Sequence, residues 1–279
     1  MDRGGRELMR GLLAFVLIAS AAIPVAAQAQ SRPRRPLLPQ PQQPLRPLPP
    51  LSLRAPVEPK FRLSLNGGAQ ISSNTSTEDG SLTINQEDAP IHNVIDLSRG
   101  GVGEVGLTYR LGKRAWAGAS AALVPRKLAG ELTATIPHPF YFGQGRAVAG
   151  TITGLTNLEA GFHGNVGITV PFSQRTELAL FGGPSVFLVT QDLISDLNYD
   201  STYPFDTATL AGAATAKATG IGLGFNAGVD LSRWMTPKLA LGVLARFSRG
   251  AVTLAGNTGA SARVETGGIT VAGGLRVRF

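Results

Sequence analysis

The side chains best suited to chemistry in this 279-residue chain are nine charged residues and one histidine, which recur on one phase of alternating sequence patterns. Five are arginines and four are carboxylates, so their charges nearly cancel. Side chains two positions apart share one face of a strand. Opposite charges on one face can pair and so offset the cost of leaving water. We therefore predict an ion-pair network of Arg62, Glu104, Arg110, Glu159, His163, Glu177, Asp230, Arg246, Arg276 and Arg278.

Nucleophilic catalysis finds little support in the sequence. It needs a nucleophile with a base within hydrogen-bond reach. The histidines are His92, His138 and His163, and only His163 shares the charged phase with serines, Ser120 and Ser185, without a motif that joins them. The absence of cysteine excludes disulfides, thiolate metal sites and a catalytic thiol. We predict no enzyme, no catalytic residues and no cofactor.

Carboxylates also cluster in two segments between the alternating stretches. Divalent cations that bridge lipopolysaccharide are one ligand for such clusters, and solvated acidic loops are the other interpretation. Their spacing matches no calcium-binding loop, so we favour solvated loops and predict no metal site. The residues concerned are Glu78, Asp79, Glu87, Asp88 and Asp96 in the first segment and Asp192, Asp196, Asp200 and Asp206 in the second.

Eight amphipathic stretches must position the charged phase. The opposite phase of each stretch is apolar throughout, as in Leu158, Phe162 and Val166. A charge at the bilayer midplane costs about 2–4 kcal/mol, so a phase free of charge is what a lipid-facing surface requires. Each stretch has the ten or so residues that a tilted strand needs to cross a bilayer. The predicted strands begin at Phe61, Gly101, Ala115, Leu158, Glu177, Gly220, Leu239 and Gly268.

The connections alternate between short and long. Short ones lie at Leu111–Arg114, Pro171–Arg175 and Arg233–Pro237. Long ones run roughly over 72–99, 125–156, 190–219 and 249–266, which matches the short periplasmic turns and longer extracellular loops of outer-membrane barrels. The predicted fold is all-β: an eight-stranded antiparallel up-and-down transmembrane barrel in which the first strand pairs with the last.

Residues 61–279 resemble the small outer-membrane barrels of the OmpA/OmpX/OmpW type. The most specific feature is the ending Gly-Gly-Leu-Arg-Val-Arg-Phe279, in which Leu275, Val277 and Phe279 alternate. In that family such an ending resembles the signal that the barrel-assembly machinery recognises. The segment Gly220–Lys238 also looks like the family's penultimate periplasmic hairpin. The resemblance implies insertion into a Gram-negative outer membrane, with its lipid and lipopolysaccharide as partners.

The first 60 residues form two further segments. Arg3, Arg6 and Arg10 precede an apolar run, and cleavage after Ala27 or Ala29 would make residues 1–29 a secretory signal peptide. A membrane anchor is the competing interpretation, but the run is short and contains Pro24.

Residues 30–60 are rich in proline and arginine, which predicts a disordered, extended periplasmic segment. We favour a spacer over a tether to anionic cell-wall polymer or to a proline-recognising partner. Residues 1–60 carry +6 of the formal net charge of +8. The basic charge therefore belongs to these segments, and we predict no nucleic-acid binding.

The inward phase leaves two functions open. Eight strands enclose a space that side chains can just fill, and a charge-paired lumen favours a closed barrel with a structural or surface-interaction role. Inward glycines leave room for water and favour a narrow porin-like channel for small or hydrophobic solutes. They are Gly68, Gly106, Gly161, Gly167, Gly222, Gly224, Gly228 and Gly242. We expect Glu104 and Arg246 to form part of the constriction.

The aromatic residues suggest interfacial girdles. Phe140, Tyr141 and Phe142 lie near one rim, and Trp116 and Trp234 lie near the other. Trp116 falls on the inward phase, so either it fills the lumen or its strand begins with a shift in register.

Overall fold

The computed structural model describes residues 59–72, 74–97, 99–256 and 261–279. The predicted signal peptide and all but the last two residues of the proline-rich segment lie outside these ranges. The ten strands are β1 Phe61–Ile71, β2 Thr75–Ile84, β3 Glu87–Asp96, β4 Arg99–Arg110, β5 Ala115–Pro137, β6 Gly145–Pro171, β7 Thr176–Asp200, β8 Thr209–Trp234, β9 Leu239–Ala255 and β10 Ser261–Arg278. In the described part of the chain, no helix is long and apolar enough to cross a membrane.

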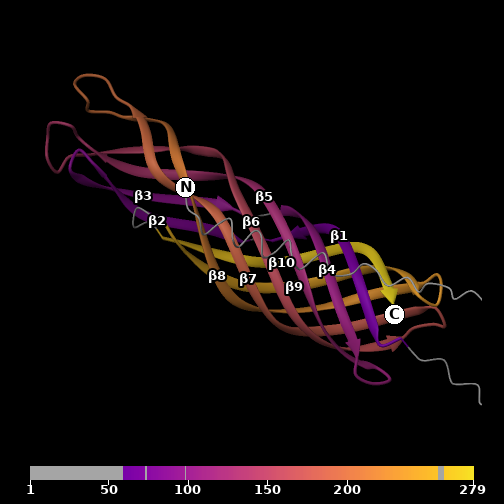
Figure 1. Cartoon of the computed structure of the whole chain (residues 1–279). Helices are drawn as coiled ribbons and strands as arrows, with labels where there is room; N and C mark the ends of the chain where they lie inside the picture. Colours follow the sequence, from indigo (N-terminus) through magenta and orange to yellow (C-terminus); the bar gives the residue numbers. More distant parts are fainter. Residues whose placement is uncertain (1–58, 73, 98, 257–260) are drawn as a thin grey trace, which may run out of the picture. The chain divides into compact units, whose positions relative to one another are not determined.

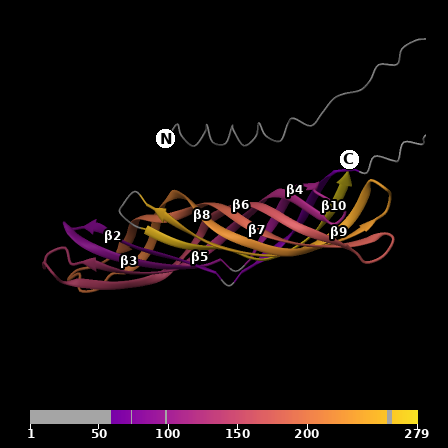
Figure 2. The ribbon, with the colours of Figure 1, turned by 90° about the horizontal axis from the view of Figure 1, so that it is seen from below.

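Eight strands form a closed antiparallel ring. β4 to β10 pair in sequence order, and β1 lies between β4 and β10. The closing pair of β1 and β10 runs from Arg62↔Arg278 to Ile71↔Ile269. Every strand edge in the ring is therefore paired, which removes the exposed backbone groups that lipid cannot satisfy. The predicted eight-stranded barrel is confirmed, and all eight predicted strands are present (Figures 1 and 2).

Beyond the first ring, the β2–β3 hairpin takes the place of β1 and β4. β2 pairs with β10 at Ser76↔Val264, and β3 pairs with β5 at Ile95↔Gly130. β5 to β8, at 23 to 27 residues, continue past the ring, but the pairing of β6 with β7 ends at Asn157↔Gln191 and that of β8 with β9 ends at Gly224↔Gly250. The strands beyond the ring therefore form two sheets, one of β7 and β8 and one of the other six strands. We call this part the extension: β2, β3 and residues 127–156, 190–219, 249–256 and 261–266. Figure 1 shows it at the end opposite the carboxyl terminus.

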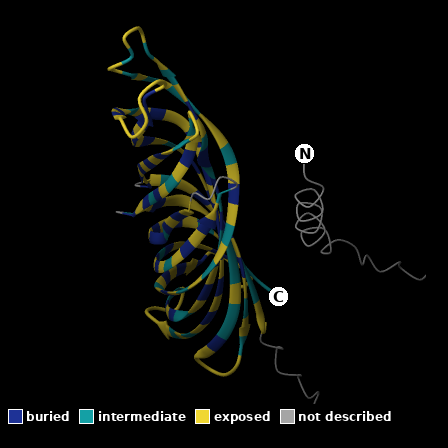
Figure 3. Ribbon diagram, turned by 90° about the vertical axis from the view of Figure 1, so that its left-hand side faces the viewer, coloured by how far each residue is buried: buried dark blue, intermediate teal, exposed yellow. Residues whose placement is uncertain are grey.

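The long loops predicted from the sequence are therefore mostly strand. The connections beyond the long strands shrink to 138–144 and 201–208. The strands continue because polar and apolar residues still alternate along them. The apolar side chains, however, change from the outer face to the inner face. In β5 the outward side chain changes from Leu123 to Lys127, and the inward one changes from Trp116 to Leu132. Figure 3 shows buried and exposed residues alternating along the whole length of the strands.

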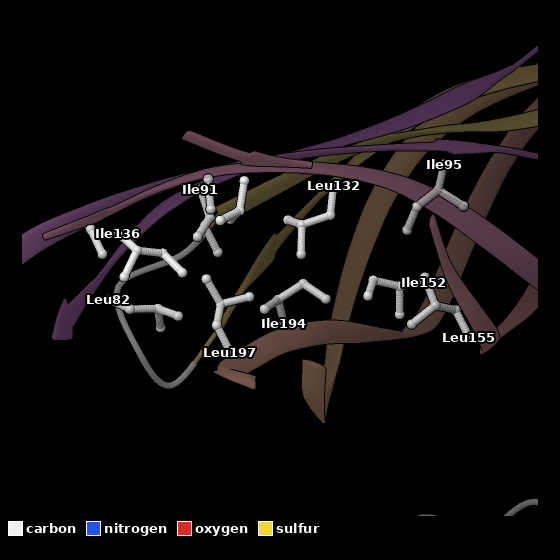
Figure 4. Packing of buried hydrophobic residues seen from close by; sticks show 12 residues of the cluster. Leu82, Ile91, Ile95, Leu132, Ile136, Ile152, Leu155, Ile194 and Leu197 are labelled. Atoms are coloured by element: carbon white, nitrogen blue, oxygen red, sulfur yellow. The ribbon is translucent and has the colours of Figure 1, made fainter. Parts of the chain in front are cut away.

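The extension is held together by an apolar interior of its own. Twelve buried residues from β2, β3, β5, β6 and β7 form one cluster (Figure 4). Each large aliphatic side chain buried in this way contributes about 1.5–3 kcal/mol. The extension thus has its apolar side chains inside, as a soluble β-protein does. The cluster comprises Leu82, Ala89, Ile91, Ile95, Leu132, Ala134, Ile136, Val148, Ile152, Leu155, Ile194 and Leu197.

Candidate functional site

Aromatic rings and guanidinium groups pack together in the lumen at the short-turn end. Arg278 donates a hydrogen bond to Glu177, and its guanidinium lies 3.5 Å from the centroid of the Trp234 ring. Arg62 lies 5.7 Å from the centroid of the Trp116 ring. Both tryptophans point inward and are 8% exposed. The prediction that they mark an interfacial girdle is wrong, because both side chains are buried in the lumen. Trp116 fills the lumen, and its strand begins without a register shift.

A second layer lies one residue pair deeper. Arg276 is fully buried, and its guanidinium donates hydrogen bonds of 3.1–3.3 Å to both carboxylate oxygens of Asp230. It also donates to Asn66 Oδ1 at 2.7 Å. Ser232 donates to the same carboxylate at 3.0 Å. The arginine charge is thus met from two other strands, β1 and β8.

The third layer joins the two residues expected at the constriction. Arg246 Nη1 and Nη2 donate to Glu104 Oε2 and Oε1 at 2.7 and 3.0 Å. This two-point contact is the strongest arrangement for a guanidinium and a carboxylate. Arg246 also donates to Ser120 and lies 5.5 Å from the centroid of the Phe181 ring. Both charged side chains are at most 4% exposed.

His163 lies in the next part of the lumen and contacts a serine. Its Nδ1 is 2.8 Å from Ser185 Oγ, and Asn226 Nδ2 donates to the same oxygen at 3.1 Å. The imidazole also meets the edge of Phe187, with ring centroids 5.9 Å apart. His163 and Ser185 are 4% and 1% exposed. The structure therefore brings together two residues that no sequence motif joins, and buries both.

Glu159 closes the seam where β10 changes its partner from β1 to β2. Gly267 adopts a positive φ of 88° at this change, so its backbone groups leave the ladder. Its N–H donates to Glu159 at 3.2 Å, and its carbonyl accepts hydrogen bonds from Gln70 and Asn74, each at 3.0 Å. Arg126 pairs with the other Glu159 oxygen at 3.2 Å.

Arg126 was not among the predicted network residues because it fell in a predicted loop. Its position in the alternation of β5 gave the available signal, since it shares the inward phase with Trp116 and Ser120. Arg110 is the remaining predicted residue, and its backbone N–H donates to Lys60 O at 2.8 Å. Its side chain borders the cavity at the short-turn mouth.

The inward glycines make room for side chains. A Cβ on Gly167 would come within 2.6 Å of the Trp116 ring, and one on Gly228 would come within 2.6 Å of Phe181. A Cβ on Gly242 would lie 2.5 Å from Arg276 Nε. At these three glycines the space expected for water is occupied by rings and a guanidinium group.

Two small cavities lie in the lumen of the described residues. One of about 40 Å³ is at the short-turn mouth, and one of about 30 Å³ reaches the Glu104–Arg246 pair. A water molecule needs roughly 10–15 Å³ measured in this way. Each cavity therefore has room for a few waters at most.

Outside the lumen, large apolar side chains surround the first ring. Their exposure to solvent in an isolated chain is explained by contact with lipid, because outward apolar bands flank polar interiors in transmembrane barrels. The fold is that of a small outer-membrane β-barrel. We call this surface the belt: Leu65, Val105, Leu107, Leu123, Leu158, Phe162, Val166, Ile168, Leu180, Ile221, Leu223, Phe225, Leu241, Val243, Phe247, Ile269, Val271 and Leu275.

No family model matches the chain, and no curated protein does so. Among solved structures, the chain is similar to the outer membrane protease OmpT from Escherichia coli, at 11% identity and a TM-score of 0.42, over 80% of this chain and 98% of that one. Neisserial surface protein A matches at 13% identity and 0.35, over 78% and 97% of the two chains. OprG from Pseudomonas aeruginosa matches at 6% identity and 0.40, over 80% and 97%.

The last residues of the barrel complete its closure. The backbones of Phe61 and Phe279 exchange two hydrogen bonds of 3.1 Å, and their rings stack with centroids 5.9 Å apart. Tyr109 joins them at 5.1 Å from Phe61. These exposed rings lie at the short-turn rim, together with outward Leu275 and Val277. They form the aromatic group at this rim that was expected of the tryptophans.

The acidic segments of the extension are tied into its structure. Glu78 is fully buried, and its carboxylate accepts hydrogen bonds from Asn93 at 3.1 Å and from the Ile194 N–H at 2.7 Å. Burial raises the pKa of Glu78 above its ordinary value. Asp192 accepts from the N–H and hydroxyl of Thr156. Across the described residues, no group of three or more potential ligands could hold a metal ion.

Proposed function

We propose that this barrel is a closed, non-enzymatic outer-membrane protein whose function is to display its extension as an interaction surface. Short turns face the periplasm in barrels of this kind, so the extension stands at the cell surface. The observation that carries the proposal is the contrast between the ring and the extension. The lumen of the ring holds paired charges, while the extension is packed around an apolar cluster of its own.

The packing of the lumen supports closure. Three successive carboxylate–arginine pairs lie in it: Asp230–Arg276 and Glu104–Arg246 join strands that are not neighbours, and Glu159–Arg126 joins the adjacent strands β6 and β5. Opening a path would break charge pairs that have no access to bulk water. This cost of several kcal/mol per ion favours the closed state.

The burial of His163 and Ser185 supports a non-enzymatic role. A substrate would have to reach a site between the Glu104 and Glu159 layers, and the cavities in the described lumen have room only for water. The proposed partners of the barrel itself are the lipid and lipopolysaccharide around the belt, together with the assembly machinery that would read Leu275, Val277 and Phe279.

Single-channel conductance in planar bilayers tests this proposal. We expect the inserted full-length chain to give no steady conductance, because the Glu104–Arg246 pair closes the lumen. Stable openings of the unmodified chain would contradict the proposal. Insertion is verified in the same preparation by protease protection of the belt strands.

A narrow channel is the second candidate, and one observation favours it. The two lumenal cavities share Arg62, Thr108 and Trp116 in their walls, and the deeper one ends at Glu104 and Arg246. If these cavities form the start of a path, Glu104→Ala should raise ion leak. Glu265→Ala, which breaks an exposed pair with Arg249 outside the lumen, is the control. Unchanged leak in Glu104→Ala would remove the channel.

A further inference from the structure

The tip of the extension carries exposed aromatic rings on two loops that contact each other. Phe142 and Tyr203 are 88% and 86% exposed, and Phe140 is 72% exposed. Phe140 and Phe205 meet with ring centroids 5.6 Å apart, and Tyr203 lies 6.1 Å from Phe205. Phe140, Tyr141 and Phe142 lie beyond β5, whose exposed side chains past Leu123 include Lys127 and Glu131 and no large apolar group. This position does not favour the predicted membrane girdle.

Buried polar groups hold these loops in place. His138 Nδ1 accepts hydrogen bonds from the backbone N–H groups of Phe140 and Tyr141, both at 3.1 Å. Arg146 donates to Phe205 O at 3.2 Å and to Pro137 O at 2.9 Å, which joins the two loops. The rings therefore sit on a fixed platform, so a partner that contacts them does not have to order the loops first.

The third side of the platform is the β2–β3 turn. Gly143 N–H donates to Glu87 at 2.9 Å, and Asn85 donates to Pro137 O at 3.2 Å. Glu87 thus belongs to the same surface as the aromatic loops. We call this surface the tip: residues 85–88, 138–146 and 199–206.

The charge of the tip is one-sided. The tip contains four carboxylates, those of Glu87, Asp88, Asp200 and Asp206. The one guanidinium of the tip, that of Arg146, is buried and donates to backbone carbonyls. A cationic ligand is therefore attracted by the acids, and aromatic faces bind guanidinium groups most favourably.

We propose that the tip binds an arginine-bearing polypeptide segment of a partner at the cell surface. The rings would stack on arginine side chains, and the carboxylates would supply attraction at longer range. Three turns joined side by side present several rings and several acids at once, which suits a chain segment better than a single small cation. This inference deepens the proposed function and rests on it, because it names the chemistry of the partner.

The test uses the full-length chain in nanodiscs of zwitterionic phosphatidylcholine. Fluorescence anisotropy measures binding of an oligo-arginine peptide and of an oligo-lysine peptide of equal length. We expect the oligo-arginine peptide to bind more tightly, since guanidinium groups stack on rings and ammonium groups do so less well. High salt should weaken both. No binding of the arginine peptide would overturn the proposal.

Two variants separate the contributions. Phe142→Ser should weaken oligo-arginine binding by about two- to fivefold, the expected effect of one exposed cation–π contact, and reduce the preference for arginine. Asp200→Asn with Asp206→Asn should weaken both peptides and flatten the salt dependence. The matched controls are Phe172→Ser, an exposed ring at the opposite end, and Glu131→Gln, an exposed acid outside the tip.

Equal effects of the tip variants and their controls would overturn the proposal. So would capture of phosphatidylcholine vesicles that Phe142→Ser abolishes and the aspartate variants leave unchanged, because that result assigns the tip to a lipid surface. Conductance of the same samples is recorded in parallel. A barrel that gives no conductance and does not bind the arginine peptide contradicts this inference alone. A barrel with stable conductance contradicts the proposed function.

Discussion

Each buried charge in the lumen is stabilised by a partner of opposite charge. Glu104 and Arg246 are nearly inaccessible to solvent, and each supplies the hydrogen-bond partners that the other lost on leaving water. Removing one member leaves an unpaired charge in a place that water reaches poorly. Removing both leaves none.

We therefore predict that the Glu104–Arg246 substitutions are strongly non-additive. Glu104→Leu or Arg246→Leu alone should lower the free energy of unfolding by about 3–5 kcal/mol, the usual result of breaking a buried pair. The double variant should be less destabilised than the sum of the two. Urea titration of the chain refolded in lipid vesicles measures this, and additive losses would contradict the prediction.

At the scale of elements, the sequence predicted the membrane ring well and the extension poorly. The phase free of charge marks every belt strand, and β5 and β9 begin at the predicted residues, Ala115 and Leu239. The sequence predicts a loop after Leu123 because a lipid-facing strand requires apolar side chains on its outer face. Beyond Lys127 the apolar phase is inside, as in a soluble protein.

The candidate site was predictable to a similar degree. Parity along the strands placed the charged residues in one lumen, but it did not determine which partners meet. Glu159 is the example: it meets Gln70, Arg126 and the N–H of Gly267 where β10 changes its partner from β1 to β2, a change that parity does not predict. Asn74 acts through the shared Gly267 carbonyl.

The stability of the β2–β3 hairpin should depend on pH because of Glu78. Because its pKa is raised in the folded state, the folded extension binds the proton more tightly than the unfolded one. The stabilisation is full below the ordinary pKa and is lost as pH rises through the raised value. We expect the hairpin amides to be better protected from hydrogen exchange near pH 5 than near pH 8, after correction for intrinsic rates.

Glu78→Gln should flatten this pH dependence. The amide can donate to Asn93 Oδ1, a buried acceptor without a protein partner, and still accept from Ile194. The control is Glu131→Gln, because Glu131 is exposed on β5. If the hairpin of Glu78→Gln keeps the pH dependence of the unmodified chain, Glu78 is not its cause.

For the whole molecule, an arginine on the outer surface should lower the free energy of unfolding much more in the belt than in the extension. Val243→Arg places a charge against lipid and should cost about 2–4 kcal/mol. Thr151→Arg, on the exposed face of β6 in the extension, should change the unfolding free energy by no more than about 0.5 kcal/mol. Urea unfolding in vesicles compares them. A similar loss for both variants would mean that lipid also covers the extension.

The inversion of polarity along continuous strands has a mechanical consequence. β5 to β8 run from the belt into the extension as continuous strands, so only the side chains can keep the bilayer from sliding along them. With the extension outside the cell, as proposed, movement toward the periplasm would draw Lys127, Lys217 and Arg249 into hydrocarbon, and the apolar cluster behind them cannot turn outward without unfolding. The extension would therefore limit how far the barrel can move toward the periplasm.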